Sequence, residues 1–129
     1  MAYPTQYRYT REHEWIDATG QPAVVGITDH AQDSLGDIVF VELPKVGDKI
    51  EKGKVFGSVE SVKAVSDLFA PASGTVAAIN EELNTSPEKI NADAHAAWIM
   101  KLDLSNPGEI DALLKAEDYE AYIKEETGH

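Results

Sequence analysis

The residue of this sequence with the clearest capacity for chemistry is Lys63, in the middle of residues 57–67. Apolar runs flank it on both sides, so a hairpin between two strands would present Lys63 at an exposed tip. A lysine amine on its long stem can be acylated, and the resulting amide carries no charge. A lysine at such a turn is ordinarily only a solvated charge that protects a sheet edge. The sequence on either side of Lys63 is therefore needed to choose between an acylated lysine and a solvated charge.

Four polar residues near the start of the chain are a second candidate for chemistry: His13, Glu14, Asp29 and His30. They lack the His-Glu-x-x-His spacing that places two imidazoles on one helix face. Scattered histidines are usually structural or solvent-facing, so we expect no metal site. A small hydrolase or metal-binding domain that uses His13, Glu14 and His30 is kept as an alternative, and metal analysis of the purified protein would test it.

Short β-type runs dominate the chain and would position these residues. The strongest, at residues 38–43, is preceded by Gly36 and followed by Pro44. Similar runs lie at residues 24–27, 55–59, 65–69, 75–79 and 98–102. Short strands at this spacing, with glycine and proline between them, are typical of a sandwich or barrel. We therefore expect a mostly β fold in which the Lys63 segment is one hairpin.

A short helix is expected after the strand at residues 24–27. Thr28 is a suitable N-cap for a helix that runs through Leu35. Gly36 then stands where a left-handed C-terminal cap is expected. The sequence thus predicts a helix between the strands at residues 24–27 and 38–43.

A second helix is expected at the C-terminal end, from about residue 106. Asn106 can cap it, Pro107 suits the first helical position, and Glu109 completes a capping-box arrangement. Its apolar stripe continues after a break near Ala116 and is expected to pack against the body of the domain: Ile110, Leu113, Leu114, Tyr119, Tyr122 and Ile123.

Composition narrows the function classes. The 129 residues, 43% of them hydrophobic, suit one compact domain. The net charge of -12 argues against nucleic acid and anionic membranes, and it favours protein partners with basic or mixed docking patches. The absence of cysteine excludes a disulfide scaffold and a cysteine zinc site. Neither a secretory signal nor a run of transmembrane length is visible, so we expect a soluble, cytoplasmic protein, a bacterial-type chain without a presequence.

The motifs around Lys63 change the balance between its two interpretations. Gly47-Asp48 and Lys52-Gly53 precede it, and Ala70-Pro71 and Ser73-Gly74 follow it. This order resembles the lipoyl and biotinyl carrier domains, in which a ligase acylates the lysine at the tip. Biotin carriers resemble Met-Lys-Met there, and the lipoyl domains of 2-oxo acid dehydrogenases resemble Asp-Lys-Ala. The triplet Val62-Lys63-Ala64 instead resembles the glycine cleavage H-protein family.

The resemblance to that family extends over most of the chain. It includes His13-Glu14-Trp15, residues 25–32, 35–44, 76–80 and 87–91, and Trp98. One departure lies at residues 91–98, where the family has a Pro-Tyr pair and a glycine before the tryptophan and this chain is one residue shorter. The departure puts the conformation of that loop in question and leaves the Lys63 segment untouched.

The resemblance implies a fold and a role. The fold would be a mostly β barrel-sandwich hybrid with a short internal helix and a C-terminal helix. Residues 1–129 would form a single lipoyl-carrier domain with a C-terminal helical extension from about residue 106. The protein would be a carrier subunit and not an enzyme, with lipoate attached as an amide to Lys63.

The resemblance also implies partners in glycine catabolism. The arm on Lys63 would carry an aminomethyl group from a pyridoxal phosphate-dependent glycine decarboxylase to a tetrahydrofolate-dependent aminomethyltransferase. An FAD-dependent dihydrolipoamide dehydrogenase would then reoxidise the arm. A lipoate ligase or lipoyl transferase would recognise the hairpin through Glu60, Val62 and Ala64.

A docking cleft for the loaded arm is a further implication. The positions that match the family's cleft are Glu14, Ile27 and Asp67. The two carboxylates would accept hydrogen bonds from the amine, and Ile27 would cover the apolar chain. A generic acyl carrier of a dehydrogenase complex, or a lipoate donor to other proteins, is the second alternative. The lack of a linker or catalytic module argues against the complex subunit.

Overall fold

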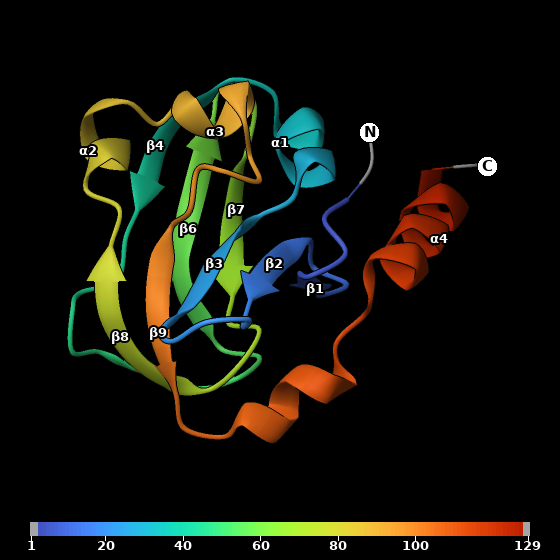
Figure 1. The fold of residues 1–129 in the computed structure, drawn as a ribbon. Coiled ribbons are helices and arrows are strands. Elements are labelled where there is room, and N and C mark those ends of the chain that lie inside the picture. Colours follow the sequence, from blue (N-terminus) through green and yellow to red (C-terminus); the bar gives the residue numbers. More distant parts are fainter. Residues whose placement is uncertain (1–2, 128–129) are drawn as a thin grey trace.

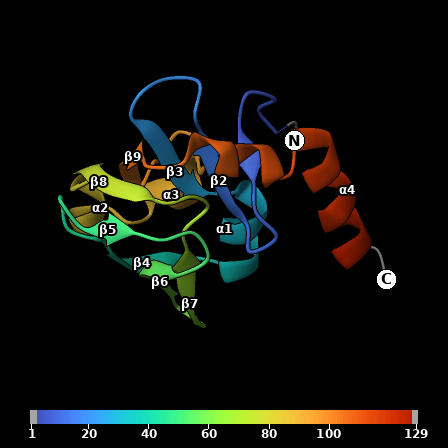
Figure 2. The ribbon, with the colours of Figure 1, turned by 90° about the horizontal axis from the view of Figure 1, so that it is seen from below.

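Two antiparallel sheets form the body of the computed structural model, which describes residues 3–127 (Figure 1). The larger sheet runs in the order β1 (Arg8–Tyr9), β2 (Glu14–Asp17), β3 (Ala23–Ile27), β9 (Met100–Leu104), β8 (Gly74–Ile79) and β5 (Lys49–Ile50). The smaller sheet contains β4 (Ile38–Glu42), β6 (Val55–Ser61) and β7 (Val65–Phe69). Figure 2 shows the two sheets as separate layers.

The main core lies between these two layers. Val41, Val59 and Leu68 of the smaller sheet are buried there together with Val25 and Leu102 of the larger sheet. Alternation along the strands produces this core, because successive side chains of a strand point to opposite faces. The expectation of a mostly β fold of the sandwich kind is confirmed, and within residues 3–127 the two sheets do not close into one barrel.

A second, aromatic core covers the outer side of the larger sheet. Tyr9 stacks on Tyr119 with ring centroids 4.8 Å apart, and Tyr7 stacks on Trp15 at 4.5 Å. Tyr119 belongs to helix α4 (Ala116–Thr127) and is fully buried. Burying an aromatic ring of this size contributes on the order of 2–3 kcal/mol. The expected packing of the C-terminal stripe against the body is confirmed.

Helix α1 (Asp29–Leu35) forms as the sequence predicts. The Thr28 hydroxyl accepts a hydrogen bond from the Ala31 amide, and Gly36 ends the helix with a φ of 78°. Two further helices, α2 (Glu82–Thr85) and α3 (Lys89–Ala92), lie at the same end of the sheets as α1 (Figure 1). Each spans only four residues, which is too short to leave a helical period in the sequence.

The start of the C-terminal region differs from the expected capped helix. Pro107–Ala112 form a 3₁₀ helix, η1, and the Asn106 side chain makes no capping hydrogen bond. The Glu109 carboxylate instead accepts hydrogen bonds from the amide and hydroxyl of Ser73 at 2.7 and 3.1 Å. Leu114 then pairs with Tyr9 before α4 begins at Ala116, so the predicted break there is confirmed. The prediction of a capping box was wrong because the Glu109 carboxylate bonds to Ser73 and not to the start of its own helix.

Three strands were not expected from the sequence, namely β1, β2 and β5. In β2, Glu14, Trp15 and Ile16 are all buried, so the period-two alternation that marks a half-exposed strand is missing. β1 and β5 have two residues each. Strand β9 starts at Met100 instead of residue 98, because the Trp98 amide is still bonded to the carbonyl of Ala96 in the preceding turn.

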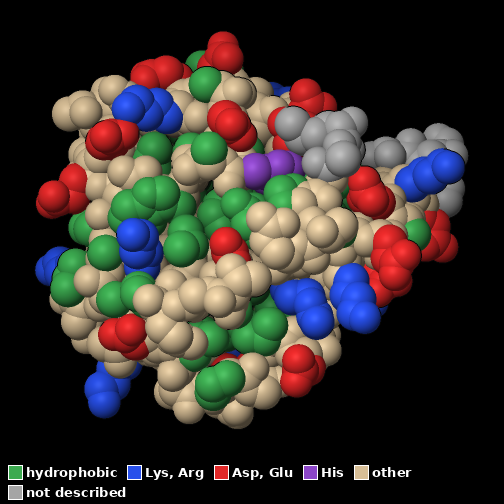
Figure 3. Space-filling model, viewed as in Figure 1, with side chains coloured by type: hydrophobic (Ala, Val, Ile, Leu, Met, Phe, Trp, Pro, Cys, Tyr) green, Lys and Arg blue, Asp and Glu red, His purple; other side chains and the backbone are tan. Residues whose placement is uncertain are grey.

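The surface of the molecule is acidic, and its helices are short. Acidic side chains are spread across the face viewed in Figure 3 and along α4. Among residues 3–127, every helix is too short or too polar to cross a membrane.

The close approach of β4 and β6 gives a test of this packing. A Cβ added at Gly57 would lie 2.4 Å from the carbonyl oxygen of Glu42, and the backbone cannot yield without parting the strands. We expect Gly57→Ala to lower the free energy of unfolding in urea by about 1–3 kcal/mol. Gly20→Ala is the control, since nothing lies within 4 Å of its added Cβ, and its effect should stay below about 1 kcal/mol. Equal effects of the two changes would contradict the contact.

Candidate functional site

Lys63 lies in the turn that joins β6 to β7. The two strands pair antiparallel, with Ser58 opposite Asp67 and Glu60 opposite Val65, which leaves residues 61–64 as the turn. Lys63 is exposed, and its neighbour Val62 is 70% exposed although it is apolar. The hairpin predicted from the sequence is therefore present, with Lys63 at its tip.

The Ser61 hydroxyl organises this turn. It accepts hydrogen bonds from the amides of Lys63 and Ala64 at 3.3 and 3.1 Å, and it lies 3.2 Å from the Ala64 carbonyl oxygen. The Ser61 amide also donates to that carbonyl at 2.8 Å. Ser61 itself is buried, with 6% exposure. The turn is thus closed by hydrogen bonds while the side chains beside it stay free of the core.

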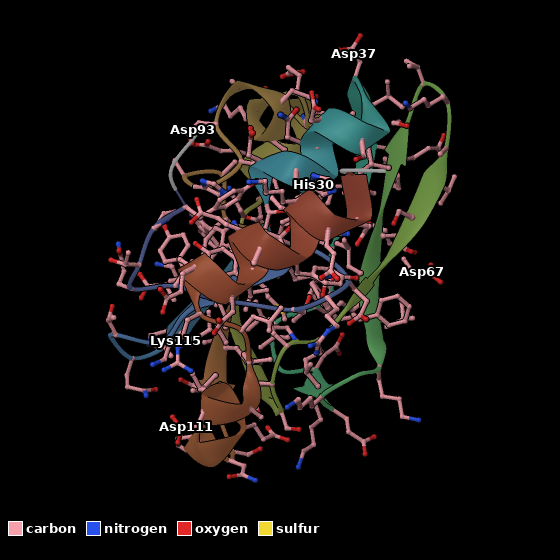
Figure 4. All side chains as sticks on the ribbon, turned by 90° about the vertical axis from the view of Figure 1, so that its right-hand side faces the viewer. His30, Asp37, Asp67, Asp93, Asp111 and Lys115 are labelled. Carbon is pink, nitrogen blue, oxygen red and sulfur yellow. The ribbon has the colours of Figure 1, made fainter. Side chains whose placement is uncertain are left out.

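The tip is also fixed to the corner between α1 and β4. The Val62 amide donates to the Asp37 carbonyl at 3.0 Å. Asn91 of α3 holds the same corner, because its side chain donates to the Gly36 carbonyl and accepts from the Ile38 amide, both at 2.9 Å. Figure 4 shows Asp37 at the same end of the molecule as the hairpin tip. The base of Lys63 is therefore anchored to the rest of the fold.

The surroundings of Lys63 suit an acyl group on its amine. No ion pair within residues 3–127 involves Lys63, so acylation would break none. Glu60, Val62 and Ala64, the expected ligase-recognition residues, are all exposed around it. A group joined to Nζ would extend into solvent from a fixed base, and this arrangement suits a carrier.

The three residues expected to dock the arm lie near one another but differ in exposure. Glu14 and Ile27 face each other across β2 and β3, with 0% and 2% exposure. The Glu14 carboxylate accepts a hydrogen bond from the Phe69 amide of β7 at 3.2 Å. Asp67, two residues earlier on β7, is exposed and points outward in Figure 4. Glu14 and Ile27 therefore reach an arm only if the chain around them opens.

Glu14 is the most perturbed carboxyl group of this region. Burial raises the pKa of Glu14 to about 7, although hydrogen bonds from Thr10 and Phe69 act in the opposite direction. The Thr10 hydroxyl donates to Glu14 Oε1 at 2.6 Å and accepts from the Glu14 amide at 3.0 Å. A buried carboxylate needs such partners because its charged form has lost its water.

His13 and His30 are brought together, with ring centroids 4.7 Å apart. Burial lowers the pKa of His13, and the nearby His30 acts in the same direction. Glu14 does not join them, since its carboxylate is turned to Thr10 and Phe69. The site of His13, Glu14 and His30 considered for a hydrolase is thus not assembled.

The segment at residues 91–98, for which the sequence predicts a departure from the family, is well packed. Ala94 is buried, and its carbonyl accepts a hydrogen bond from the Trp15 indole at 3.1 Å. The His95 ring accepts from the Asp29 amide at 3.2 Å, and the His95 carbonyl accepts from the Tyr7 hydroxyl at 2.9 Å. This loop therefore closes on the aromatic core.

A two-sheet β fold with an exposed lysine at a hairpin tip defines the class of carrier domains that the sequence resembles. Comparison with known proteins gives the particular family: residues 7–126 match the family described as glycine cleavage H-protein. The glycine cleavage system H proteins of Acidobacterium capsulatum and Koribacter versatilis are 74% and 67% identical, each over the full length of both chains. A crystal structure of the H protein from Mycobacterium marinum superposes with a TM-score of 0.85 at 37% identity, covering 98% of this chain and 100% of that one.

The chain therefore belongs to the glycine cleavage H-protein family. Membership supports the role of a lipoyl carrier in the glycine cleavage system. The structural match also confirms the expected fold class.

Some residues that shape the site carry no sequence signal of their role. The Ser61 side chain bonds to backbone amides of its own turn, and the Asn91 side chain bonds to the backbone of a segment far away in the sequence. Asp37 contributes only its backbone carbonyl, which accepts from the Val62 amide. Backbone groups are common to all residues, so only the folded geometry identifies the one that holds the tip.

The raised pKa of Glu14 predicts a pH-dependent stability. A carboxyl group that binds its proton more tightly when folded stabilises the fold fully below its unfolded pKa, and this contribution is lost as pH rises. For Glu14 the window runs from about 4.5 to about 7, and the loss amounts to about 3 kcal/mol. Glu14→Gln imitates the neutral acid, because its amide can donate to Thr10 while its oxygen accepts from Phe69.

Urea unfolding of both proteins between pH 4.5 and 8, in metal-free buffer, measures this contribution. We expect the parent to lose stability relative to Glu14→Gln as pH rises across the window. Parallel stability curves for the two proteins would show that Glu14 titrates normally.

Proposed function

We propose that the protein carries lipoate as an amide on Nζ of Lys63 and acts as the mobile carrier of the glycine cleavage system, not as an enzyme. The observation that supports this residue is its exposure at the tip of a turn whose backbone is fixed by Ser61. The amide would form between the lipoate carboxyl carbon and Nζ, with loss of the amine charge and of the activating group. The whole chain would serve as one carrier domain.

Three enzymes would use this carrier in turn. We infer that they are a pyridoxal phosphate-dependent glycine decarboxylase, a tetrahydrofolate-dependent aminomethyltransferase and an FAD-dependent dihydrolipoamide dehydrogenase. Bound lipoate supplies a disulfide that is reduced as it takes up the aminomethyl group. The protein itself supplies reach and a high local concentration of the arm at each active site. Its acidic surface suits partners with basic docking patches.

A lipoate ligase or lipoyl transferase would attach the group. Glu60, Val62 and Ala64 support this recognition because all three are exposed on the two sides of Lys63. Val62 presents an apolar side chain to solvent, where it is available for contact with a ligase. Its amide, bonded to Asp37, keeps that side chain in a constant position relative to Lys63.

The loaded arm would fold back toward Glu14, Ile27 and Asp67. The closeness of Glu14 to β7 supports this, since its carboxylate already accepts from the Phe69 amide beside Asp67. An arriving ammonium group could replace that amide as the donor to Glu14, and the apolar arm would cover Ile27. Docking would protect the labile aminomethyl group from water.

The first test concerns the attachment residue. Lys63→Arg keeps the positive charge and the fold but offers no amine that a ligase can acylate. We expect intact mass and peptide mapping to place lipoate on Lys63 of the parent alone. The Lys63→Arg protein should carry no lipoate and should support no glycine decarboxylation.

The matched control for this test is Lys54→Arg, which alters an exposed lysine in the loop just before β6, away from the hairpin tip. It should be lipoylated and active like the parent. Lipoate found on Lys54 or Lys45, or full activity of Lys63→Arg, would refute the assignment.

The second test concerns docking of the loaded arm. A partly buried hydrogen bond to a charged group is worth about 1.5–3 kcal/mol, so Glu14→Gln should release the one-carbon unit about ten- to hundredfold faster without any partner enzyme. Asp67 is exposed, and Asp67→Asn should have a smaller effect, below about fivefold. Free formaldehyde from each loaded variant, followed over time, measures the release.

Asp103→Asn is the control, because Asp103 is an exposed strand carboxylate on β9, which pairs with β3 and β8 and not with β7. It should release formaldehyde at the parent's rate. Lipoylation of Lys63 should be unchanged in all three variants. Release from Glu14→Gln at the parent's rate would mean that the arm stays in solvent.

A further inference from the structure

A group of potential metal ligands lies apart from the Lys63 hairpin. Within residues 3–127, one set of three or more such residues has its ligand atoms close together: His13, His30 and Glu126, all within 4.8 Å of one another. The three come from distant parts of the chain, namely the turn before β2, helix α1 and the last turn of α4. Figure 4 shows His30 on α1 next to α4.

The spacing of these atoms is close to that of a tetrahedral centre. With metal–nitrogen and metal–oxygen distances of about 2.1 Å, neighbouring ligand atoms lie about 3.4 Å apart. His13 Nε2 and Glu126 Oε1 are already 3.5 Å apart. Glu126 is exposed, at the end of a helix, so a rotamer change can bring its carboxylate closer. The set is thus nearly formed and requires only small side-chain adjustments.

His13 is held so that its Nε2 is the ring nitrogen that faces Glu126. Its Nδ1 is 2.8 Å from the Tyr119 hydroxyl, which is in turn 2.8 Å from the Thr28 hydroxyl. A partner on one ring nitrogen of a histidine fixes the ring and leaves the other nitrogen for a metal. His13 also has a φ of 74°, unusual for a residue other than glycine, and this backbone is held in place by the fold.

We propose that His13, His30 and Glu126 bind one divalent transition-metal ion of the Zn²⁺ class. Two imidazoles and one carboxylate are ligands that suit Zn²⁺, and a fourth position would remain for water. A shallow pocket lined by Arg11, His13, Tyr122, Glu125 and Glu126 gives access from solvent. The bound ion joins α4 to α1 and to the start of β2, and it is independent of lipoylation.

The test uses full-length protein without an affinity tag, stripped with a chelator and titrated with Zn²⁺ by calorimetry. We expect one equivalent to bind, and Co²⁺ at the same site to show the visible absorption of a tetrahedral centre. Glu126→Gln and His30→Gln should each weaken Zn²⁺ binding at least about tenfold. Tyr119→Phe, which frees the His13 ring, should weaken it by about tenfold.

Glu125→Gln is the matched control, since Glu125 lines the same pocket but is not a member of the set. It should bind Zn²⁺ like the parent. Zn²⁺ should also raise the melting temperature of the parent and of Glu125→Gln, but not that of Glu126→Gln, whose fold is checked by circular dichroism. Absence of binding, or binding that Glu126→Gln and His30→Gln leave unchanged, would overturn the proposal.

Discussion

The turn at Lys63 has to be exposed and rigid at once, and the hydrogen bonds of Ser61 satisfy both demands. Apolar packing normally makes a loop rigid, but it also buries the side chains that do the packing. Here the Ser61 hydroxyl closes the turn through backbone groups, and the Val62 amide ties it to the Asp37 carbonyl. Lys63 and its neighbours therefore face solvent from a fixed base, which is what the proposed attachment of lipoate requires.

The rest of the smaller sheet and its covering helices follow from this arrangement. Strand β6 has to run between β4 and β7 for the tip to reach the corner at Asp37, and Gly57 allows β4 to approach closely. Asn91 then fixes that corner from α3. A four-residue helix with little stability of its own is thus part of the support for the lysine.

Glu14 joins the two layers by a different kind of interaction. Its buried carboxylate bonds to Thr10 in the larger layer and to the Phe69 amide in the smaller one. Burial without these partners would be costly, so the N-terminal segment and β7 have to meet at a defined distance. The same carboxylate could accept a hydrogen bond from a cationic ligand only after the surrounding chain opens, which links the stability of this junction to the proposed docking of the arm.

The sequence by itself determined the strands β4, β6 and β7, the capped helix α1 and the position of Lys63 at a tip. Local signals suffice there: apolar alternation, glycine and proline at the boundaries, and Thr28 before a helix. The family resemblance reached further, because an ordered series of motifs carries information that no single element has. Strand β2 escaped local analysis because Glu14, Trp15 and Ile16 are buried in succession, so the strand shows no period-two alternation.

Only the tertiary structure decided which partners the polar side chains take. Glu109 suits a helix cap in the sequence, yet it bonds to Ser73, since a neighbouring loop offers it two donors at once. His13 and His30 are 17 positions apart in the sequence, yet their rings lie in contact beside Glu126 because β2 and β3 pair and α4 packs across them. Local propensity depends on near neighbours in the chain, whereas hydrogen bonds and burial depend on neighbours in space.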